Sequence, residues 1–280
     1  MKHLKIMAAF LCCAAFLSGC AQPEESSITE TDEASASGTD TGEMLYQSEY
    51  VNIEYTGKSS DDYYTYLNFN VENLTDRQLV IAANDISIND AMIDPFLYAP
   101  IESGVVSEVQ MEFSNTELEE QSLENFGTVE FSFFITDGSS SDGLETSGKL
   151  TLDLGEFTAS ERKEGIVLYD SGGLKVVCTG VKPDDSLNAS VTFDIQNNMG
   201  QKIDIDIRDV YIDGSPVDAQ LYHSIGEGKH RVCDMYFWDE GVLTDSSEKI
   251  EFVLGAFDPE TFDCILETDT LSADLKSLQN

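Results

Sequence analysis

Residues 69–113 read FNVENLTDRQLVIAANDISINDAMIDPFLYAPIESGVVSEVQMEF, and the pattern returns 124 positions later, without a gap, at residues 193–237. Twelve of the 45 aligned pairs are identical. They are Phe69/Phe193, Asn73/Asn197, Ile81/Ile205, Asp85/Asp209, Ile88/Ile212, Asp94/Asp218, Leu97/Leu221, Tyr98/Tyr222, Ile101/Ile225, Gly104/Gly228, Met111/Met235 and Phe113/Phe237. Self-similarity at a fixed spacing indicates a duplicated structural unit. The chain therefore predicts two copies of one fold, each of about 115 residues, a common domain size.

Apolar residues recur at every second position in both copies. The alternating runs are Leu67, Phe69 and Val71; Val109, Met111 and Phe113; Val129, Phe131, Phe133 and Ile135; and, in the second copy, Val191, Phe193 and Ile195; Ile203, Ile205 and Ile207; and Cys233, Met235 and Phe237. Alternation over short runs, with one face wet, is typical of antiparallel strands. We predict an all-β chain made of two tandem antiparallel β-sandwich domains.

Turn residues mark the joints between these strands. Asp213-Gly214 is a two-residue hairpin signal, and Asn89-Asp90 holds the same place in the first copy. Gly104 and Gly228 are predicted to occupy turn positions with positive φ. Helix is minor: Ser114–Glu117 predicts a capping box that opens a helix through Leu123, and Asp258-Pro259 predicts a single capped turn.

The first 19 residues are typical of an export signal. Lys2 and Lys5 precede an apolar run of eleven residues, which is too short to span a bilayer, since a spanning helix needs about 20. The run ends in Leu17-Ser18-Gly19-Cys20, which resembles the lipobox of bacterial lipoproteins. The resemblance implies that Cys20 is thioether-linked to diacylglycerol and becomes the mature N-terminus. An ordinary secretory signal with an incidental cysteine is the alternative.

Residues 20–43 are predicted to be a disordered acidic tether, because the segment from Ala21 to Glu43 has no Lys, Arg or aromatic residue and is rich in Ser, Thr, Gly and acids. We expect the first β-sandwich domain at residues 44–158 and the second at 165–280, joined by a short charged link. Leu45-Tyr46 and Ser48 match Leu168-Tyr169 and Ser171, so the duplication extends upstream of residue 69.

The order of these motifs resembles the tandem immunoglobulin-like domains of extracellular lipoproteins in Gram-positive bacteria, a family of mostly unassigned function. In each copy the order of motifs begins with Leu-Tyr-x-Ser, continues through Phe69 and Asn73 or their counterparts, and ends in hydrophobic-x-Met-x-Phe. The resemblance covers nearly all of the mature chain. It implies an immunoglobulin-like fold and a location on the extracellular face of the cell membrane. The Cys…Trp…Cys pattern of conventional immunoglobulin domains is absent, so strand order stays open.

The chain is strongly acidic, with 53 Asp and Glu against 15 Lys and Arg and a net charge of −38. Charge of this sign repels phosphates, so we expect no nucleic-acid partner. The expected partners are the membrane, through the N-terminal lipid, and an unknown protein or glycan.

Three cysteines would remain free after lipidation of Cys20, namely Cys178, Cys233 and Cys264. Each lies on the apolar parity of its run, so we predict small buried hydrophobic residues. A disulfide between two of them is the alternative. No CxxC or HxxxH spacing predicts a metal site.

Asp85, Asp94, Asp209 and Asp218 recur at matched positions around the two hairpins. Carboxylates beside loop carbonyls suit calcium, the one cofactor considered. Capping of local turn amides by the aspartates is the alternative, since a structural turn is duplicated with its fold. Asp137-Gly138-Ser139-Ser140-Ser141 resembles the metal-ion-dependent adhesion site of integrin-type domains, but that site needs a following helix, so a polar hairpin loop is preferred.

The sequence contains no nucleophile-elbow motif G-x-S-x-G. When the two copies are aligned, His223 and His230 correspond to Ala99 and Val106, so neither histidine belongs to a catalytic arrangement shared by both copies. Trp238 and Tyr64 are the candidate ligand-binding residues, because exposed aromatic rings stack on sugars and peptides. We therefore predict a non-enzymatic, membrane-anchored surface lipoprotein that binds a protein or a glycan. A structural spacer in an envelope complex is the alternative, and a hydrolase without recognisable motifs is the third possibility.

Overall fold

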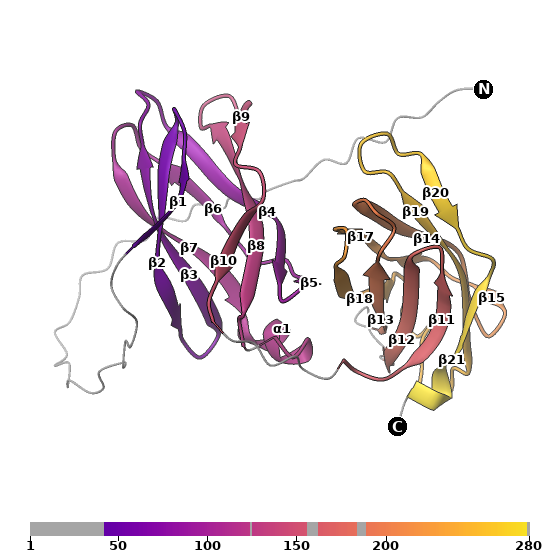
Figure 1. The fold of residues 1–280 in the computed structure, drawn as a ribbon. Coiled ribbons are helices and arrows are strands. Elements are labelled where there is room, and N and C mark those ends of the chain that lie inside the picture. The colour runs from indigo at the N-terminus through magenta and orange to yellow at the C-terminus, as the bar shows by residue number, and fades with distance from the viewer. Residues whose placement is uncertain (1–41, 124, 156–161, 184–188, 279–280) are drawn as a thin grey trace, which may run out of the picture. The chain divides into compact units, whose positions relative to one another are not determined.

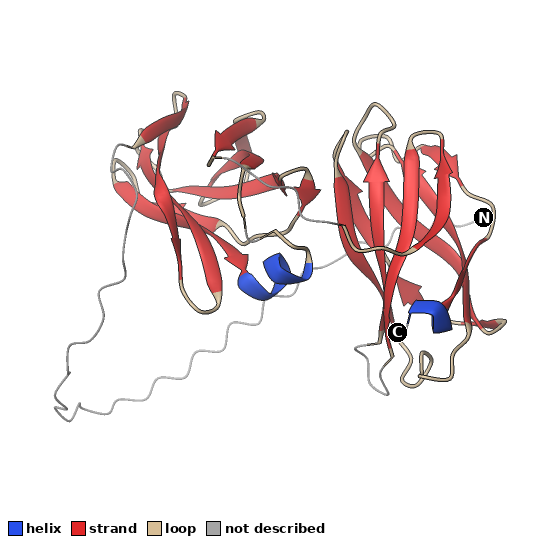
Figure 2. Ribbon diagram, turned by 60° about the horizontal axis from the view of Figure 1, so that its bottom comes forward, coloured by secondary structure: helices blue, strands red, loops and turns tan. Residues whose placement is uncertain are grey.

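The structure is a computed structural model, and it describes residues 42–123, 125–155, 162–183 and 189–278. Nearly all of its regular structure is strand (Figure 2). The described part of the first half contains β1 (Glu43–Gln47), β2 (Val51–Ser60), β3 (Tyr64–Asn73), β4 (Leu79–Ile88), β5 (Ala91–Met92), β6 (Tyr98–Ile101), β7 (Val106–Ser114), α1 (Asn115–Glu120), β8 (Thr128–Asp137), β9 (Gly143–Thr146) and β10 (Leu150–Asp153).

The described part of the second half contains eleven further strands and a short 3₁₀ helix. They are β11 (Ile166–Ser171), β12 (Leu174–Lys182), β13 (Ser190–Asn197), β14 (Ile203–Ile212), β15 (Ser215–Pro216), β16 (Ala219–Gln220), β17 (Tyr222–Ile225), β18 (His230–Phe237), β19 (Lys249–Phe257), β20 (Cys264–Glu267), β21 (Leu271–Asp274) and the 3₁₀ helix Leu275–Leu278.

The two halves repeat one order of strand pairing (Figure 1). In the first half β1, β2, β3 and β7 are neighbours in one layer, and β10, β8, β4 and β5 in the other, with β6 beside β4 and β9 beside β8. In the second half β11, β12, β13 and β18 take the first arrangement. There β21, β19, β14 and β15 take the second, with β17 beside β14 and β20 beside β19. Within each half these pairs are antiparallel, so the chain is all-β as predicted.

Irregularities in the strands are duplicated too. Bulges lie between Met44/Tyr46 and Val167/Tyr169, between Tyr55/Gly57 and Cys178/Gly180, between Asn84/Ser87 and Arg208/Tyr211, and between Ile135/Thr136 and Ala256/Phe257. A bulge adds one residue to one strand and twists it locally. Bulges at equivalent positions therefore give both halves the same local twists.

Each half has a hydrophobic core formed by the inward members of the alternating runs. Phe69 on β3 is 1% exposed, and its ring lies 5.5 Å from that of Phe133 on β8, in the other layer. Phe193 on β13 is also 1% exposed, with its ring 5.3 Å from that of Phe252 on β19. Edge-to-face aromatic pairs of this kind join the two layers of each half, and truncation of such a side chain typically costs about 3–5 kcal/mol.

The repeated asparagine that ends β3 and β13 is buried and makes matching hydrogen bonds in both halves. Asn73 Nδ2 donates to the carbonyl oxygens of Arg77 (2.8 Å) and Ile101 (3.0 Å), and its Oδ1 accepts from the Thr75 amide (2.9 Å). Asn197 Nδ2 donates to the carbonyl oxygens of Gln201 (2.8 Å) and Ile225 (2.9 Å), and its Oδ1 accepts from the Met199 amide (3.0 Å). A buried amide that satisfies three backbone groups is a structural requirement of this turn.

The predicted turns are present. Asp213 and Gly214 join β14 to β15 with φ of 49° and 78°, and Asn89 and Asp90 join β4 to β5 with φ of 50° and 73°. Two successive positive φ values identify the hairpin turn that matches strand twist. Gly104 and Gly228 also have positive φ, at 66° and 69°.

The helix α1 begins as predicted, with the Ser114 side chain accepting a hydrogen bond from the Glu117 amide. It ends at Glu120, three residues earlier than expected. The alternation of Ile203, Ile205 and Ile207 puts Asp204 on the opposite, solvent-facing side of the strand, but Asp204 is only 4% exposed. It accepts hydrogen bonds from the Tyr222 and Ser224 hydroxyls.

Candidate functional site

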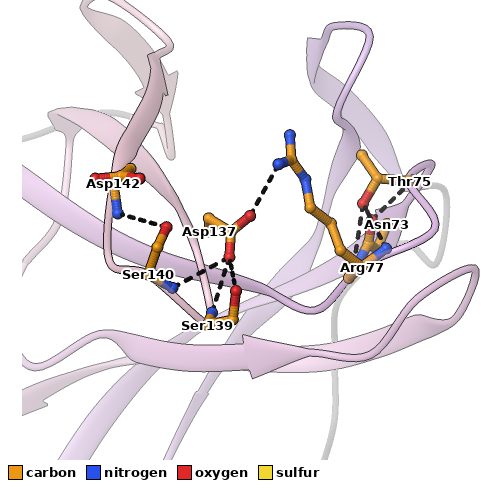
Figure 3. Close-up of polar contacts among 7 residues, drawn as sticks. All are labelled: Asn73, Thr75, Arg77, Asp137, Ser139, Ser140 and Asp142. Carbon is orange, nitrogen blue, oxygen red and sulfur yellow. Dashed lines mark hydrogen bonds and ion pairs between the residues drawn. The ribbon is translucent and has the colours of Figure 1, made fainter.

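The Asp137–Asp142 loop, which resembled a metal-ion adhesion site, is held together by its own side chains (Figure 3). Asp137 Oδ1 accepts hydrogen bonds from the Ser139 hydroxyl (2.6 Å) and from the amides of Ser139 (2.8 Å) and Ser140 (3.3 Å). Its Oδ2 pairs with Arg77 Nη1 at 2.8 Å. These donors lower the pKa of Asp137 to about 2, with the Ser139 hydroxyl contributing most. Both carboxylate oxygens are therefore already engaged by the protein.

The same loop occurs in the second half, where Asp258 takes the place of Asp137. Asp258 Oδ1 accepts from the amides of Glu260 (2.9 Å) and Thr261 (2.9 Å), and its carbonyl oxygen accepts from the Phe262 amide (2.9 Å). The Asp137 carbonyl likewise accepts from the Ser141 amide (2.8 Å). Strand β9 follows the loop in the first half, and β20 in the second. The loop is therefore a duplicated capped turn, which agrees with the preferred interpretation of the sequence.

The calcium candidates lie apart in each half. Asp85 and Asp209 sit at equivalent bulges with φ of 54° and 53°, a left-handed conformation that Asp tolerates better than most residues. Asp94 and Asp218 are exposed and follow the short hairpins. Within the described residues, no group of three or more His, Cys, Asp or Glu side chains is placed to hold a metal ion. The duplicated bulge thus explains why Asp85 and Asp209 are repeated.

The cysteine prediction holds for two of the three thiols. Cys178 and Cys233 are buried, and burial raises the pKa of each thiol to about 12. Cys264 was predicted to be buried but is exposed, because the short strand β20 lies beside the end of β19 and only its Leu266 packs against the core. All three are free thiols, so the alternative of a disulfide is not realised.

The outward side of β2, β3 and β7 presents a different set of residues, which the strand register arranges in rows. Glu112, Tyr66 and Ser59 share one row, Gln110, Asn68 and Gly57 the next, and Glu108, Asn70 and Glu54 the third. Tyr64 precedes these rows and Glu72 with Asn52 follows them. We call this surface the amide face: Asn52, Glu54, Gly57, Ser59, Tyr64, Tyr66, Asn68, Asn70, Glu72, Glu108, Gln110 and Glu112.

Amide side chains are fixed in place at the centre of this face. Gln110 Nε2 donates to Asn68 Oδ1 (2.9 Å), and Asn68 Nδ2 donates to the Gly57 carbonyl (3.1 Å) and the Ser59 hydroxyl (3.1 Å). Asn70, one row further, has no hydrogen-bond partner for its amide within the described part of the chain. A fixed amide pair beside an open donor and acceptor is suited to binding hydroxyl groups.

A shallow groove of about 580 Å³ runs over this centre, and Thr56, Asn68, Asn70, Glu108 and Gln110 line it. Gly57 lies at the β2 bulge with φ of 141°, a value that favours glycine, and no atom lies within 4 Å of where its Cβ would be.

Two tyrosines of β3 share the amide face: Tyr66 lies in the row next to Asn68, and Tyr64 lies beyond it at the end of the face. The rings of Tyr64 and Tyr66 lie 6.2 Å apart at 44°, and Tyr64 is 42% exposed. The Tyr66 hydroxyl donates to Asp61 Oδ2 (2.8 Å), which raises the pKa of Tyr66 to about 12 and fixes its ring. Tyr64 was a candidate from the sequence, whereas Asn68, Asn70 and Gln110 were not, since only cross-strand register brings them together.

The second half carries a different surface at the equivalent positions. Thr192, Asp194 and Asp234 stand where the first half has Asn68, Asn70 and Gln110. Asp194 is buried and lies 3.0 Å from His230 Nδ1, whereas the Thr192 hydroxyl donates to Asp234 Oδ1 (2.6 Å). His230 is therefore paired with the Asp194 carboxylate, and the Thr192 hydroxyl with the Asp234 carboxylate. The duplicated interior is thus shared, while the outward faces have diverged.

Trp238, the other candidate from the sequence, follows β18 and is 62% exposed. Its backbone amide donates to the Asp218 carbonyl (3.1 Å). Tyr236, two residues earlier, is 51% exposed and on the same strand parity. The structure places Trp238 and Tyr64 on separate halves, so each belongs to its own surface.

Comparison with known proteins adds little to this geometry. No family model matches the chain, and no curated protein matches it. Among solved structures, a crystal structure of the YadV chaperone is similar over 75% of this chain and 92% of that one, with 13% identity and a TM-score of 0.23. Among the residues that the structure describes, no helix has the length and apolar character needed to cross a bilayer. Leu17, Ser18, Gly19 and Cys20 lie outside the described residues.

Proposed function

We propose that this chain is a non-enzymatic, extracellular lipoprotein, anchored to the cell membrane through Cys20, whose two immunoglobulin-like domains present a binding surface for a neutral glycan. The observation that carries the proposal is the amide face, where the Asn68–Gln110 pair and the free Asn70 amide line one groove and the exposed Tyr64 ring stands at the end of the same face. The lipobox and the acidic tether support the location.

The composition of the amide face favours a sugar over other ligands. Pyranose rings have an apolar CH face that stacks on tyrosine, and hydroxyl groups that donate to carboxylates and accept from amides. Glu54, Glu72, Glu108 and Glu112 supply acceptors, and none of the residues that define the face is Lys, Arg or His. An anionic glycan would find no counter-charge there. A neutral glycan is therefore the best match.

The expected affinity is modest, because the groove is shallow. One stacked ring and a few hydrogen bonds support a dissociation constant on the order of 0.1 mM, which corresponds to about 5 kcal/mol.

Binding to an array of neutral and anionic oligosaccharides, followed by calorimetry with the best ligand, tests the proposal. We expect Tyr64→Ala and Asn70→Ala to weaken binding about tenfold each. The matched controls are Tyr98→Ala and Asn84→Ala, which change exposed residues of the same types outside the amide face. Equal affinity in all four variants, or a preference for anionic glycans, would contradict the proposal.

Anchoring has its own test. Cys20→Ala should abolish incorporation of a labelled fatty acid into the chain, and unchanged labelling would contradict the lipid anchor.

A further inference from the structure

The tip of the β19–β20 loop carries an exposed phenylalanine in an unfavourable backbone conformation. Phe262 is 72% exposed and has φ of 60°. Positive φ in a bulky non-glycine residue is uncommon, because Cβ then crowds the backbone. Both the conformation and the exposure of this ring are therefore unfavourable in the free chain.

The duplicated loop shows that its geometry does not require an aromatic residue. Ser141 occupies the same position in the first half, with φ of 61° and the same hydrogen bond from its amide to the carbonyl of the loop's first aspartate. The two loops are built alike and differ in the side chain at the tip. The phenylalanine thus contributes something that the turn itself does not need.

The residues near Phe262 in the loop indicate the chemistry of a surface that the ring would contact. Cys264 and Ile265 are exposed beside it, so the tip is apolar over several residues. Glu260 and Asp263 lie on either side of Phe262 along the loop and are exposed, and neither has a salt-bridge partner within the described residues. The loop is an apolar anchor inside an acidic rim.

We propose that Phe262 is the anchor of a protein-binding site, and that the partner is a protein with an apolar pocket rimmed by Lys or Arg. Buried aromatic anchors surrounded by a polar rim dominate the energetics of many interfaces, and complementary rim charge selects the partner. An anionic lipid surface would be repelled by Glu260 and Asp263. A second copy of this chain presents the same acidic loop, and its net charge is −38. This site is independent of the amide face, which lies in the first half.

Photo-crosslinking in cells that produce the full chain tests the proposal. p-Benzoyl-L-phenylalanine at position 262 should give one discrete protein adduct, and the same group at position 141 should not. Mapping the adduct by mass spectrometry should locate an apolar pocket with adjacent Lys or Arg, and adding Glu260→Lys with Asp263→Lys should remove the adduct. An adduct with another copy of the chain, an adduct with lipid only, equal adducts at both positions, or no protein adduct would overturn the proposal.

Measurements on the purified chain provide the second test. Phe262→Ser should leave the melting temperature equal or higher, because serine occupies the matching position in the first half. It should weaken binding to the mapped partner by on the order of 30-fold. A lower melting temperature would assign Phe262 a structural role and overturn the proposal. Sedimentation of the chain with phosphatidylcholine vesicles that is lost in Phe262→Ser would also overturn it.

Discussion

Replacement of the duplicated asparagine should destabilise both halves by similar amounts. In Asn73→Ala the carbonyls of Arg77 and Ile101 and the amide of Thr75 lose their partners, and the site is only 1% exposed. Each such hydrogen bond contributes about 1 kcal/mol, so the expected loss of unfolding free energy is about 3 kcal/mol. Asn197→Ala removes the matching bonds and should cost about as much.

Urea denaturation, monitored by far-ultraviolet circular dichroism, measures this loss of unfolding free energy. With a slope of about 1.5 kcal/mol per molar urea, Asn73→Ala should lower the midpoint of the affected transition by about 2 M. Asn70→Ala is the control on the same strand, and its effect should stay within about 0.5 kcal/mol, as is usual for surface substitutions.

A second substitution separates hydrogen bonding from loss of volume. Asn73→Asp keeps the shape but replaces the donor by an oxygen that faces two carbonyls, so it should destabilise at least as much as alanine at neutral pH. A loss below about 1 kcal/mol in Asn73→Ala, or an Asp variant as stable as the parent chain, would refute the assignment of Asn73 as a structural residue.

Three further outcomes follow from the described contacts. The folded pKa of Asp137, about 2, lies below its unfolded value, so its stabilisation is present above about pH 4 and is lost as the pH falls toward 2; acid titration of Asp137→Asn should show a flatter loss of stability, and an unchanged profile would contradict this. Cys264 should react with a thiol reagent in the native chain, whereas Cys178 and Cys233 should react only after denaturation; native labelling of all three would count against their burial. Asp85→Gly should be at least as stable as the parent and Asp85→Val less stable, with no change in melting temperature on adding calcium; a rise with calcium would restore the metal hypothesis.

Much of the fold could be predicted because duplication and alternation act on the interior. The alternation of apolar residues at every second position assigns Phe69 and Phe193 to the inward face of their strands, and both are buried. The Asp213-Gly214 turn could be predicted because its backbone conformation restricts residue type.

The errors have physical reasons as well. Cys264 follows an apolar parity, but it is the first residue of a short outer strand of which only Leu266 reaches the core. Asp204 alternates like a surface residue, yet the Tyr222 and Ser224 hydroxyls satisfy its carboxylate and allow its burial.

The amide face could not be predicted from the sequence, because its rows join residues of three strands, with Asn68 11 positions from Gly57 and 42 from Gln110. Gln110 meets Asn68 only through the β3–β7 register, and Gly57 meets Asn68 only through the β2 bulge. Tyr64 was identified by its aromatic ring alone, without the amide side chains that share its face.

Mapping of amide chemical shifts during titration with a neutral oligosaccharide tests the central claim most directly. The proposal predicts saturable shifts concentrated at Tyr64, Asn68, Asn70 and Gln110, which saturate only at about tenfold higher oligosaccharide concentration in Asn70→Ala. Saturable shifts confined to other surfaces of the chain, or none with any neutral oligosaccharide that the array covers, would contradict it.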